Sequence, residues 1–331
     1  MLLAGTASML WSSAFVTAGF LLGGGARKID PLTLTVLRYL IGGVIILFVG
    51  WMTKRPLFFN SKRQFLLVLG TALQLYLLTS LFSFMGQQSV TATSGALIVD
   101  AGPVILVALW NLAMLKCSKM EFFSVTVAAV GALMVLNILT ASGFTYDGGR
   151  LIGQLFCLGA AIIWITGSHC TKALMESGGD SIVMTGWCEL VAGLMGAVVM
   201  IPAAPMLIFP AAADAWICVA VMAIFPSALA YIAWGVALKQ CEMWKLLLTQ
   251  NLTPVFTMIG SFMLLGEKLT LFNVLGMILV FGGLFAVVCA GHRKKQTFPA
   301  EQFSVSTGKF EDQEADKQYN KRNDCPEADA Q

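Results

Sequence analysis

Long apolar stretches follow one another along most of this chain, and they restrict its fold more than any other feature of the sequence. A helix that crosses the hydrocarbon core of a bilayer needs about 20 apolar residues. We therefore expect an all-α integral membrane protein with ten transmembrane helices. The expected spans are residues 2–23, 32–52, 64–85, 94–115, 122–141, 151–171, 181–201, 215–238, 246–265 and 271–291.

The scarcity of charge excludes the other broad classes. Charged residues make up 12% of the chain and hydrophobic residues 57%, whereas a soluble domain carries about 25% charged residues. This composition argues against a soluble enzyme and against a disordered chain. A membrane β-barrel would show alternating polarity, but residues 44–49 form a continuous apolar run.

The positive charges in the short connections predict the orientation. If the N-terminus is cytoplasmic, the connections on the cytoplasmic side contain more Lys and Arg than those on the outer side. An excess of Lys and Arg is typical of the cytoplasmic connections of membrane proteins. We therefore expect both termini to be cytoplasmic, in a plasma or inner membrane. Residues 292–331 are polar and mixed in charge, so we expect them to form a disordered cytoplasmic tail.

The two halves of the chain repeat each other at an offset of about 151 to 153 residues. Residues 8–13 around Trp11 align with residues 161–166 around Trp164. Because each half, 1–141 and 151–291, contains five expected helices, the second half should enter the membrane from the opposite side. Such inverted repeats are typical of secondary transporters, whose substrate site lies near the bilayer midplane.

Short motifs in both halves resemble the EamA-like branch of the drug/metabolite transporter superfamily. The matching residues are Trp11-Ser12-Ser13, Pro31, Arg38, Leu252-Thr253-Pro254-Val255-Phe256, Leu265-Gly266-Glu267-Lys268-Leu269 and Gly276 to Gly283. The resemblance implies ten helices, transport of small metabolites, often by export, and a cavity lined by the first, third, fourth, sixth, eighth and ninth helices. The chain departs from the family pattern at Met114-Leu115-Lys116-Cys117 and at Asp100.

Four ionisable residues fall within the expected spans, where an unpaired charge is costly. Asp100 either faces the cavity, where it binds a substrate amine or exchanges a proton, or it pairs with Arg38 or a lysine. Arg38 and Glu189 occupy related positions of the two repeats, which favours a structural or gating ion pair over contact with substrate. His169 has a side chain suited to proton coupling, although a single histidine in a helix often only packs. Glu267 is expected to cap the helix after it or to neutralise Lys268.

Aromatic and amide side chains near the middle of the spans are the expected substrate-binding groups. Aromatic walls with a few polar groups suit a small zwitterionic or aromatic metabolite, although any one of these aromatics could instead face lipid or a neighbouring helix. With Asp100 included, the candidates are Trp11, Gln74, Tyr76, Asp100, Trp164, Tyr231, Trp234, Gln250 and Asn251. The cluster at Gln250 and Asn251, beside Pro254, is the first choice.

These features predict a secondary transporter for small polar metabolites such as amino acids or their derivatives. The alternative is a membrane-embedded enzyme acting on lipid-linked substrates, but we identify no catalytic residues. We also expect no metal site, because the eight cysteines form no ligand cluster, and no cofactor. The expected partners are a small-molecule substrate and the lipid bilayer, a homodimer is allowed, and no nucleic acid is expected.

Overall fold

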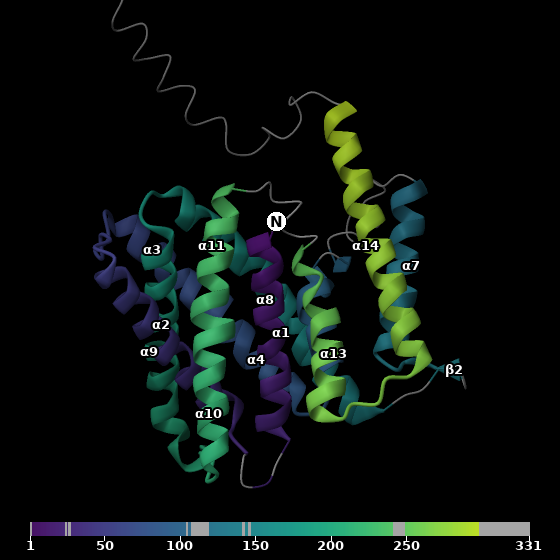
Figure 1. The fold of residues 1–331 in the computed structure, drawn as a ribbon, viewed down its shortest axis with the longest axis horizontal. Coiled ribbons are helices and arrows are strands. Elements are labelled where there is room, and N and C mark those ends of the chain that lie inside the picture. The colour runs from purple at the N-terminus through teal and green to yellow at the C-terminus, as the bar shows by residue number, and fades with distance from the viewer. Residues whose placement is uncertain are drawn as a thin grey trace, which may run out of the picture. The chain divides into compact units, whose positions relative to one another are not determined.

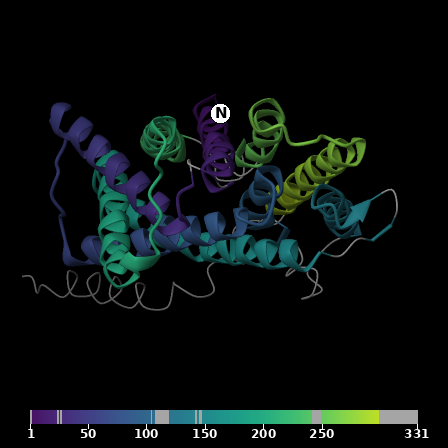
Figure 2. The ribbon, with the colours of Figure 1, turned by 90° about the horizontal axis from the view of Figure 1, so that it is seen from below.

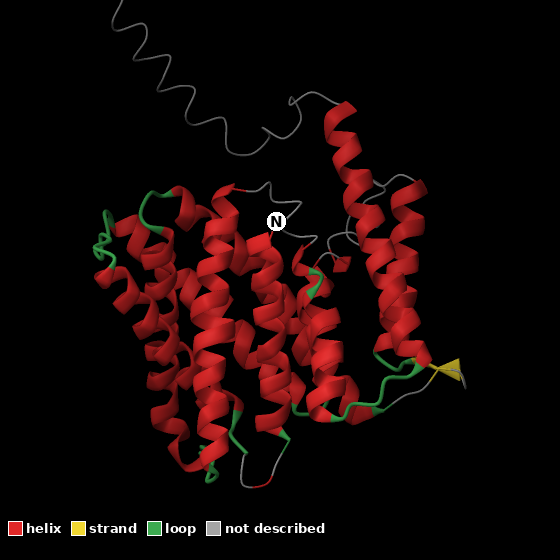
Figure 3. Ribbon diagram, in the orientation of Figure 1, coloured by secondary structure: helices red, strands yellow, loops and turns green. Residues whose placement is uncertain are grey.

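The computed structural model describes residues 2–23, 25, 28–103, 105–106, 119–140, 143–144, 147–240 and 249–297. Within these ranges the chain is helical, as predicted, except for the two-residue strands β1 (Leu139–Thr140) and β2 (Gly143–Phe144), which pair antiparallel (Figure 3). Residues 1–288 form one compact unit, which is described below. The expected tail begins inside the last helix, which continues to Thr297, and residues 298–331 lie outside the described ranges.

The helices are named as in Figure 1. The first half contains α1 (Leu2–Leu22), α2 (Pro31–Met52), α3 (Lys62–Thr71), the π-helix η2 (Ala72–Leu78), α4 (Thr79–Gln87), α5 (Ala92–Ala96), the π-helix η3 (Leu97–Ala101) and α7 (Lys119–Val135). The second half contains α8 (Gly148–Glu176), α9 (Ser181–Ala203), the 3₁₀ turn η4 (Ala204–Met206), α10 (Ala213–Met222), the π-helix η5 (Ala223–Leu229), α11 (Ala230–Gln240), α13 (Thr253–Leu265) and α14 (Leu271–Thr297).

Among the residues that the structure describes, six helical segments are long and apolar enough to cross a membrane. They lie at Leu2–Leu22, Pro31–Met52, Lys62–Gln87, Gly148–Glu176, Ser181–Met206 and Ala213–Trp234. Each of the other four expected spans overlaps a shorter apolar helix of 10–17 residues, so the expected count of ten spans stays a prediction. These shorter helices lie at Ala92–Ala101, Phe122–Val135, Thr253–Leu265 and Leu271–Ala286.

The second helices of the two halves, α2 and α9, have the same local design. Asp30 caps α2 and Asp180 caps α9, and each carboxylate accepts hydrogen bonds from two backbone N–H groups of the first turn. The buried positions from Ser181 to Gly196 also have the same spacing as those from Pro31 to Ile46. In this register Arg38 corresponds to Cys188, and Glu189 corresponds to Tyr39. The expected equivalence of Arg38 and Glu189 is therefore wrong by one position.

Helices from opposite halves pack closely where glycine removes a side chain. The backbone of Leu190 in α9 comes so near Gly43 in α2 that an added Cβ would lie 2.4 Å from its nitrogen. Gly131 in α7 and Gly276 in α14 approach each other's carbonyl oxygens in the same way. Both helix pairs lie side by side in Figure 1, and small residues permit this close packing in membranes.

The first helix also packs against the second half. In Figure 2, α1 lies between α11 and α13, and both helices contact it. The α4 helix packs along α8, where Gly86 meets Gly153 and Cys157. The two halves therefore interleave, and no surface between separate lobes runs through the described unit.

Polar contacts join the halves at opposite ends of the bundle. At one end, Arg55 pairs with Asp180 at 2.5 Å, and Gln64 donates to the carbonyl oxygen of Gly178. At the other end, Oε1 of Glu267 accepts from the backbone N–H of Ala92 at 2.7 Å and Oε2 accepts from Oγ1 of Thr93 at 2.9 Å. Glu267 thus caps α5, which contradicts its expected role at the following helix.

The contact at Gly43 predicts a large effect of one methyl group. We expect Gly43→Ala to lower the free energy of unfolding by about 1–3 kcal/mol, because the new Cβ must displace the backbone of Leu190. Gly5→Ala is the matched control, since nothing lies within 4 Å of its added Cβ. Thermal unfolding of the purified variants in detergent measures both. Equal midpoints for the two variants would contradict the close packing.

The Arg55–Asp180 contact predicts a pH-dependent contribution to stability. Partial burial raises the pKa of the Asp180 carboxyl group, but the hydrogen bond from Arg55, the backbone N–H groups of α9 and the charge of Arg55 outweigh this effect and hold it below its ordinary value. The Asp180 carboxylate therefore stabilises the folded state fully at pH values above the pKa of an aspartate in the unfolded chain, about 4. This stabilisation is lost as the pH falls through the lowered pKa of Asp180 in the folded state.

Asp180→Asn tests this contribution, because Asn still caps a helix but cannot form the ion pair. We expect the variant to unfold at a lower temperature than the wild type at pH 7, by the equivalent of about 0.5–1 kcal/mol. The difference should shrink at pH 3. A difference that is the same at both pH values would show that the charge of Asp180 is not responsible.

Candidate functional site

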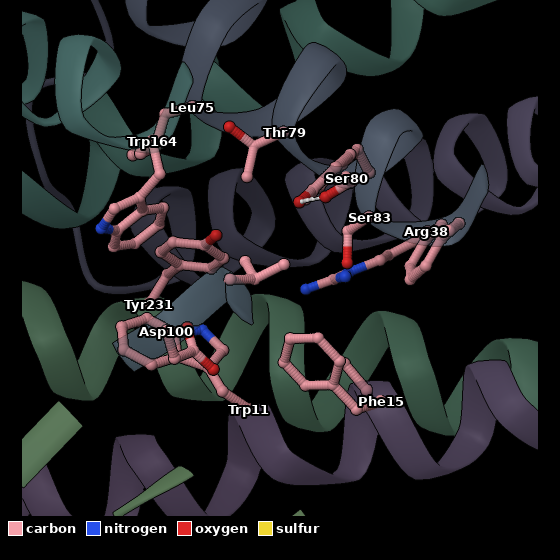
Figure 4. A pocket seen from close by; sticks show the side chains of 14 residues that line it. Trp11, Phe15, Arg38, Leu75, Thr79, Ser80, Ser83, Asp100, Trp164 and Tyr231 are labelled. Carbon is pink, nitrogen blue, oxygen red and sulfur yellow. Dashed lines mark hydrogen bonds between the residues drawn. The ribbon is translucent and has the colours of Figure 1, made fainter. Parts of the chain in front are cut away.

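A cavity of about 60 Å³ lies inside the bundle, lined by residues from both halves of the chain (Figure 4). It is bordered by α1, α2, η2, α4, η3, α8 and α11. The lining therefore includes α2, the second helix, which the family resemblance did not imply. No residue of α13, which lies in the expected ninth helix, lines the cavity. The lining residues are Trp11, Ala14, Phe15, Arg38, Tyr39, Leu75, Thr79, Ser80, Ser83, Phe84, Val99, Asp100, Trp164 and Tyr231.

Trp11 is the centre of an aromatic cluster at one side of the cavity. Its ring lies 6.3 Å from that of Trp164, 5.3 Å from that of Tyr231 and 5.1 Å from that of Trp234. Tyr76 joins the cluster through Tyr231, with ring centroids 4.8 Å apart. The structure thus brings together five of the expected substrate-binding aromatics, and offset or edge contacts of this kind stabilise each ring pair.

Asp100 is a buried acid on the cavity wall. It lies in η3, where the backbone departs from the ordinary α-helical hydrogen-bond pattern, and it is 9% exposed. The side chain of Gln250 lies next to its carboxyl group. However, Oδ2 of Asp100 and Nε2 of Gln250 both lack a hydrogen bond of ordinary geometry. Asp100 makes no ion pair with Arg38, so the expected structural alternative for Asp100 is not seen.

Arg38 is a buried cation on the same wall, 5% exposed. Its Nε donates to Oγ of Ser227 at 2.6 Å, and Nη2 donates to the carbonyl oxygen of Pro226 at 3.4 Å. Its guanidinium carbon lies 4.9 Å from the ring centre of Tyr39 and 5.9 Å from that of Phe84. These contacts hold the guanidinium in one orientation, and Figure 4 shows it reaching toward the middle of the view.

Glu189 lies near Arg38 but is not hydrogen-bonded to it. Glu189 is fully buried, its Oε2 lies against Gly42, and neither carboxylate oxygen has a hydrogen-bond partner. The charges interact at longer range. The expected direct ion pair is therefore absent, because the guanidinium of Arg38 bonds to Ser227 and Pro226.

Gln250 and Asn251 lie beside the cavity and do not line it. Both are 3% exposed, and they precede α13 at a point where the helix is interrupted by a turn at residues 251–252. The carbonyl oxygen of Thr249 accepts a hydrogen bond from Oγ of Ser8 in α1 at 2.7 Å. This break presents Gln250 to Asp100, so the first-choice cluster is close to the cavity but behind its wall.

Two other expected residues lie away from the cavity lining. Gln74 is half-buried in η2, and its carbonyl oxygen accepts from Oγ1 of Thr79. His169 is exposed on α8, which contradicts its expected place inside the bundle. Neither belongs to the lining set.

The polar part of the wall consists of residues that were not among the expected site residues. Thr79, Ser80 and Ser83 line the cavity, and their spacing in α4 places them on one helical face. That spacing is a signal that could have identified them. Tyr39 was also missed; its hydroxyl group lies 2.5 Å from Oγ of Ser80. Within the described ranges, no group of three or more His, Cys, Asp or Glu side chains is arranged to hold a metal ion.

Comparison with known proteins relates this architecture to a family. The sequence profile of the EamA-like transporter family matches residues 1–137 and 151–289. An uncharacterized transporter of Archaeoglobus fulgidus is 23% identical over 297 residues, which cover 86% of this chain and 96% of the relative. The uncharacterized transporter YyaM of Bacillus subtilis is 27% identical over 61% of this chain and 66% of its own length.

The fold also matches a solved structure. A crystal structure superposes with a TM-score of 0.61 over 89% of this chain and 98% of its own. The two chains share 20% of their residues at aligned positions. This match supports the fold alone.

The aromatic cluster predicts that Trp11 stabilises the bundle strongly. We expect Trp11→Ala to cost about 3–5 kcal/mol, because it removes a buried ring from the contacts with three other aromatics. Trp51→Ala is the control, since Trp51 is 63% exposed. Thermal unfolding in detergent compares them, and an equal loss in both variants would argue against the cluster.

Proposed function

The chain belongs to the EamA-like transporter family, and on that premise we propose that it is a secondary transporter of small polar metabolites such as amino acids or their derivatives. The observation that carries this proposal is the cavity between the two halves, which holds a buried acid, a buried cation and several hydroxyl groups against an aromatic wall. Sites that bind small molecules combine apolar walls with a few polar groups in this way.

We place the site between two inverted repeats of five transmembrane helices, residues 1–141 and 151–291. The tandem family match and the shared design of α2 and α9 support the repeat. The interleaving of the halves around the cavity supports its use for alternating access, in which one set of helices rocks against the other. The excess of Lys and Arg in alternate connections favours cytoplasmic termini in a plasma or inner membrane.

Proton exchange at Asp100 supplies the driving force in this proposal. A charged carboxylate buried without a counterion costs several kcal/mol, so the empty site favours the protonated acid. A substrate ammonium group offers the missing positive charge and releases the proton. Because the substrate and the proton compete for the same carboxylate, each inward proton can displace one outward substrate. An inward proton gradient then drives export.

An enzyme acting on lipid-linked substrates is less well supported. Such an enzyme needs a nucleophile beside an acid or base where water meets lipid. The cavity instead places Asp100 and Arg38 inside the bundle, where both are almost fully buried, and a guanidinium cation cannot act as a base. The family match and the names of the relatives also indicate a transporter.

Transport into proteoliposomes tests the proposal. With a mixture of the twenty radiolabelled amino acids outside and an acidic lumen, we expect the wild type to accumulate label as protons leave. Asp100→Asn should abolish this gradient-driven accumulation, because the amide can neither release a proton nor pair with the substrate ammonium group. Glu176→Gln is the control, since Glu176 is exposed at the end of α8.

The outcomes separate the parts of the proposal. Accumulation that survives in Asp100→Asn, and that still disappears when nigericin collapses the pH gradient, would assign the proton to another group. Wild-type vesicles that accumulate no more label than empty liposomes would contradict amino acids as substrates.

A further inference from the structure

We propose that Arg38 binds the carboxylate of the substrate while Asp100 binds its ammonium group, so that the cavity selects zwitterions over molecules with a single charge. This inference rests on the proposed transport function and adds a role for Arg38, which the sequence placed in a structural or gating ion pair. Its basis is that both residues line one cavity without neutralising each other.

The geometry of Arg38 leaves part of its guanidinium group available. Nε is used by Ser227 and one N–H of Nη2 by the carbonyl group of Pro226. The other N–H donors, at the end formed by Nη1 and Nη2, form no hydrogen bond within the described residues. Two parallel N–H groups at such an end match the two oxygens of a carboxylate. The existing bonds and the rings of Tyr39 and Phe84 hold this fork in place before the substrate arrives.

Among the described residues, no carboxylate forms an ion pair with Arg38. Glu189 is near but accepts no hydrogen bond, and it does not line the cavity. Glu189 interacts with Arg38 only through longer-range electrostatics and occupies none of its N–H donors. The arginine can then offer its remaining donors to an incoming anion.

The two charged groups lie at different parts of the wall. In Figure 4, Arg38 extends into the view beside Ser83, whereas Asp100 is drawn on the side where Trp11 and Tyr231 are labelled, and all five residues line the same cavity. The aromatic faces near Asp100 suit an ammonium group, which is attracted to them, and the apolar part of a side chain. The hydroxyl groups of Thr79 and Ser83 lie on the polar side of the same cavity.

The size of the cavity adds a condition. A volume of about 60 Å³ holds a few water molecules, since one needs about 10–15 Å³ by this measure. A zwitterion therefore enters when the helices that line the cavity separate. The lining residue Leu75 belongs to the π-helix η2 and Asp100 to η3, and Tyr231 follows closely after η5. Such π-helical segments often mark functional sites.

Binding of matched probes to the purified full-length protein tests the inference. The first set is L-leucine, 3-methylbutylamine, which lacks the carboxylate, and 4-methylpentanoate, which lacks the ammonium group. The second set is L-phenylalanine, 2-phenylethylamine and 3-phenylpropanoate. We expect the wild type to bind at least one amino acid about tenfold or more tightly than either of its single-charge analogues, the effect of one charge-assisted contact.

The variants should separate the two contacts. Arg38→Gln should weaken binding of the amino acid to the level of the amine and leave binding of the amine within about twofold. Asp100→Asn should weaken the amino acid to the level of the acid. Arg38→Lys keeps the charge without the planar fork and should restore part of the preference, which a loss of folding would not allow. Glu176→Gln is again the control.

Three results would overturn the inference. The first is a wild-type protein with no preference for the amino acid, including one that binds none of the six probes. The second is an Arg38→Gln variant that weakens amine and amino acid equally. The third is recovery of amino-acid binding in the double variant Arg38→Gln/Glu189→Gln, which would give Arg38 only the role of balancing Glu189. Binding and accumulation of amines alone would contradict this inference but would leave the proposed transport function intact.

Discussion

The cost of leaving a polar group unpaired in a low-dielectric interior governs this structure. A bilayer offers no partner to backbone N–H and C=O groups, so a membrane chain must satisfy them within helices. The described helices follow this rule, but the ordinary α-helical hydrogen-bond pattern changes in η2, η3, η5 and the turn before α13. Each of these segments adjoins the cavity: Leu75 of η2 and Asp100 of η3 line it, Ser227 of η5 accepts from Arg38, and Gln250 before α13 lies next to Asp100.

The same cost explains why the ionisable groups inside the bundle matter. Arg38, Asp100 and Glu189 are each at most 9% exposed, and none forms a direct ion pair with another. A structural ion pair would have joined them at hydrogen-bond distance. Their arrangement leaves a cation and an acid facing one cavity, which is a poor solution for stability alone and a good one for a ligand with both charges.

Much of the site could be predicted from the sequence because its residues carry strong local signals. The position of Trp11 and Trp164 in the two repeats placed both in one aromatic cluster, and the rarity of an acid in an apolar span identified Asp100. Other features depend on helix register and rotation. A one-residue shift in the alignment of α2 and α9 paired Arg38 with the wrong residue. The exposure of His169 and the partner of Glu267 depend on which helix faces pack against each other. The sequence of one apolar span does not indicate this.

Side-resolved labelling of a cysteine at Thr79 tests the central claim most directly, because Thr79 lines the cavity. The variant Thr79→Cys, in a background without the native cysteines, is exposed to a membrane-impermeant maleimide from either side of sealed vesicles. An added pair of cysteines at Thr93 and Ser261, whose hydroxyl oxygens are 2.9 Å apart, can lock one end of the bundle with a disulfide. Alternating access predicts labelling from both sides in the unlocked protein and from only the opposite side after locking. Labelling that is absent from both sides, or unchanged by the lock, would contradict a cavity that opens alternately to the two sides of the membrane.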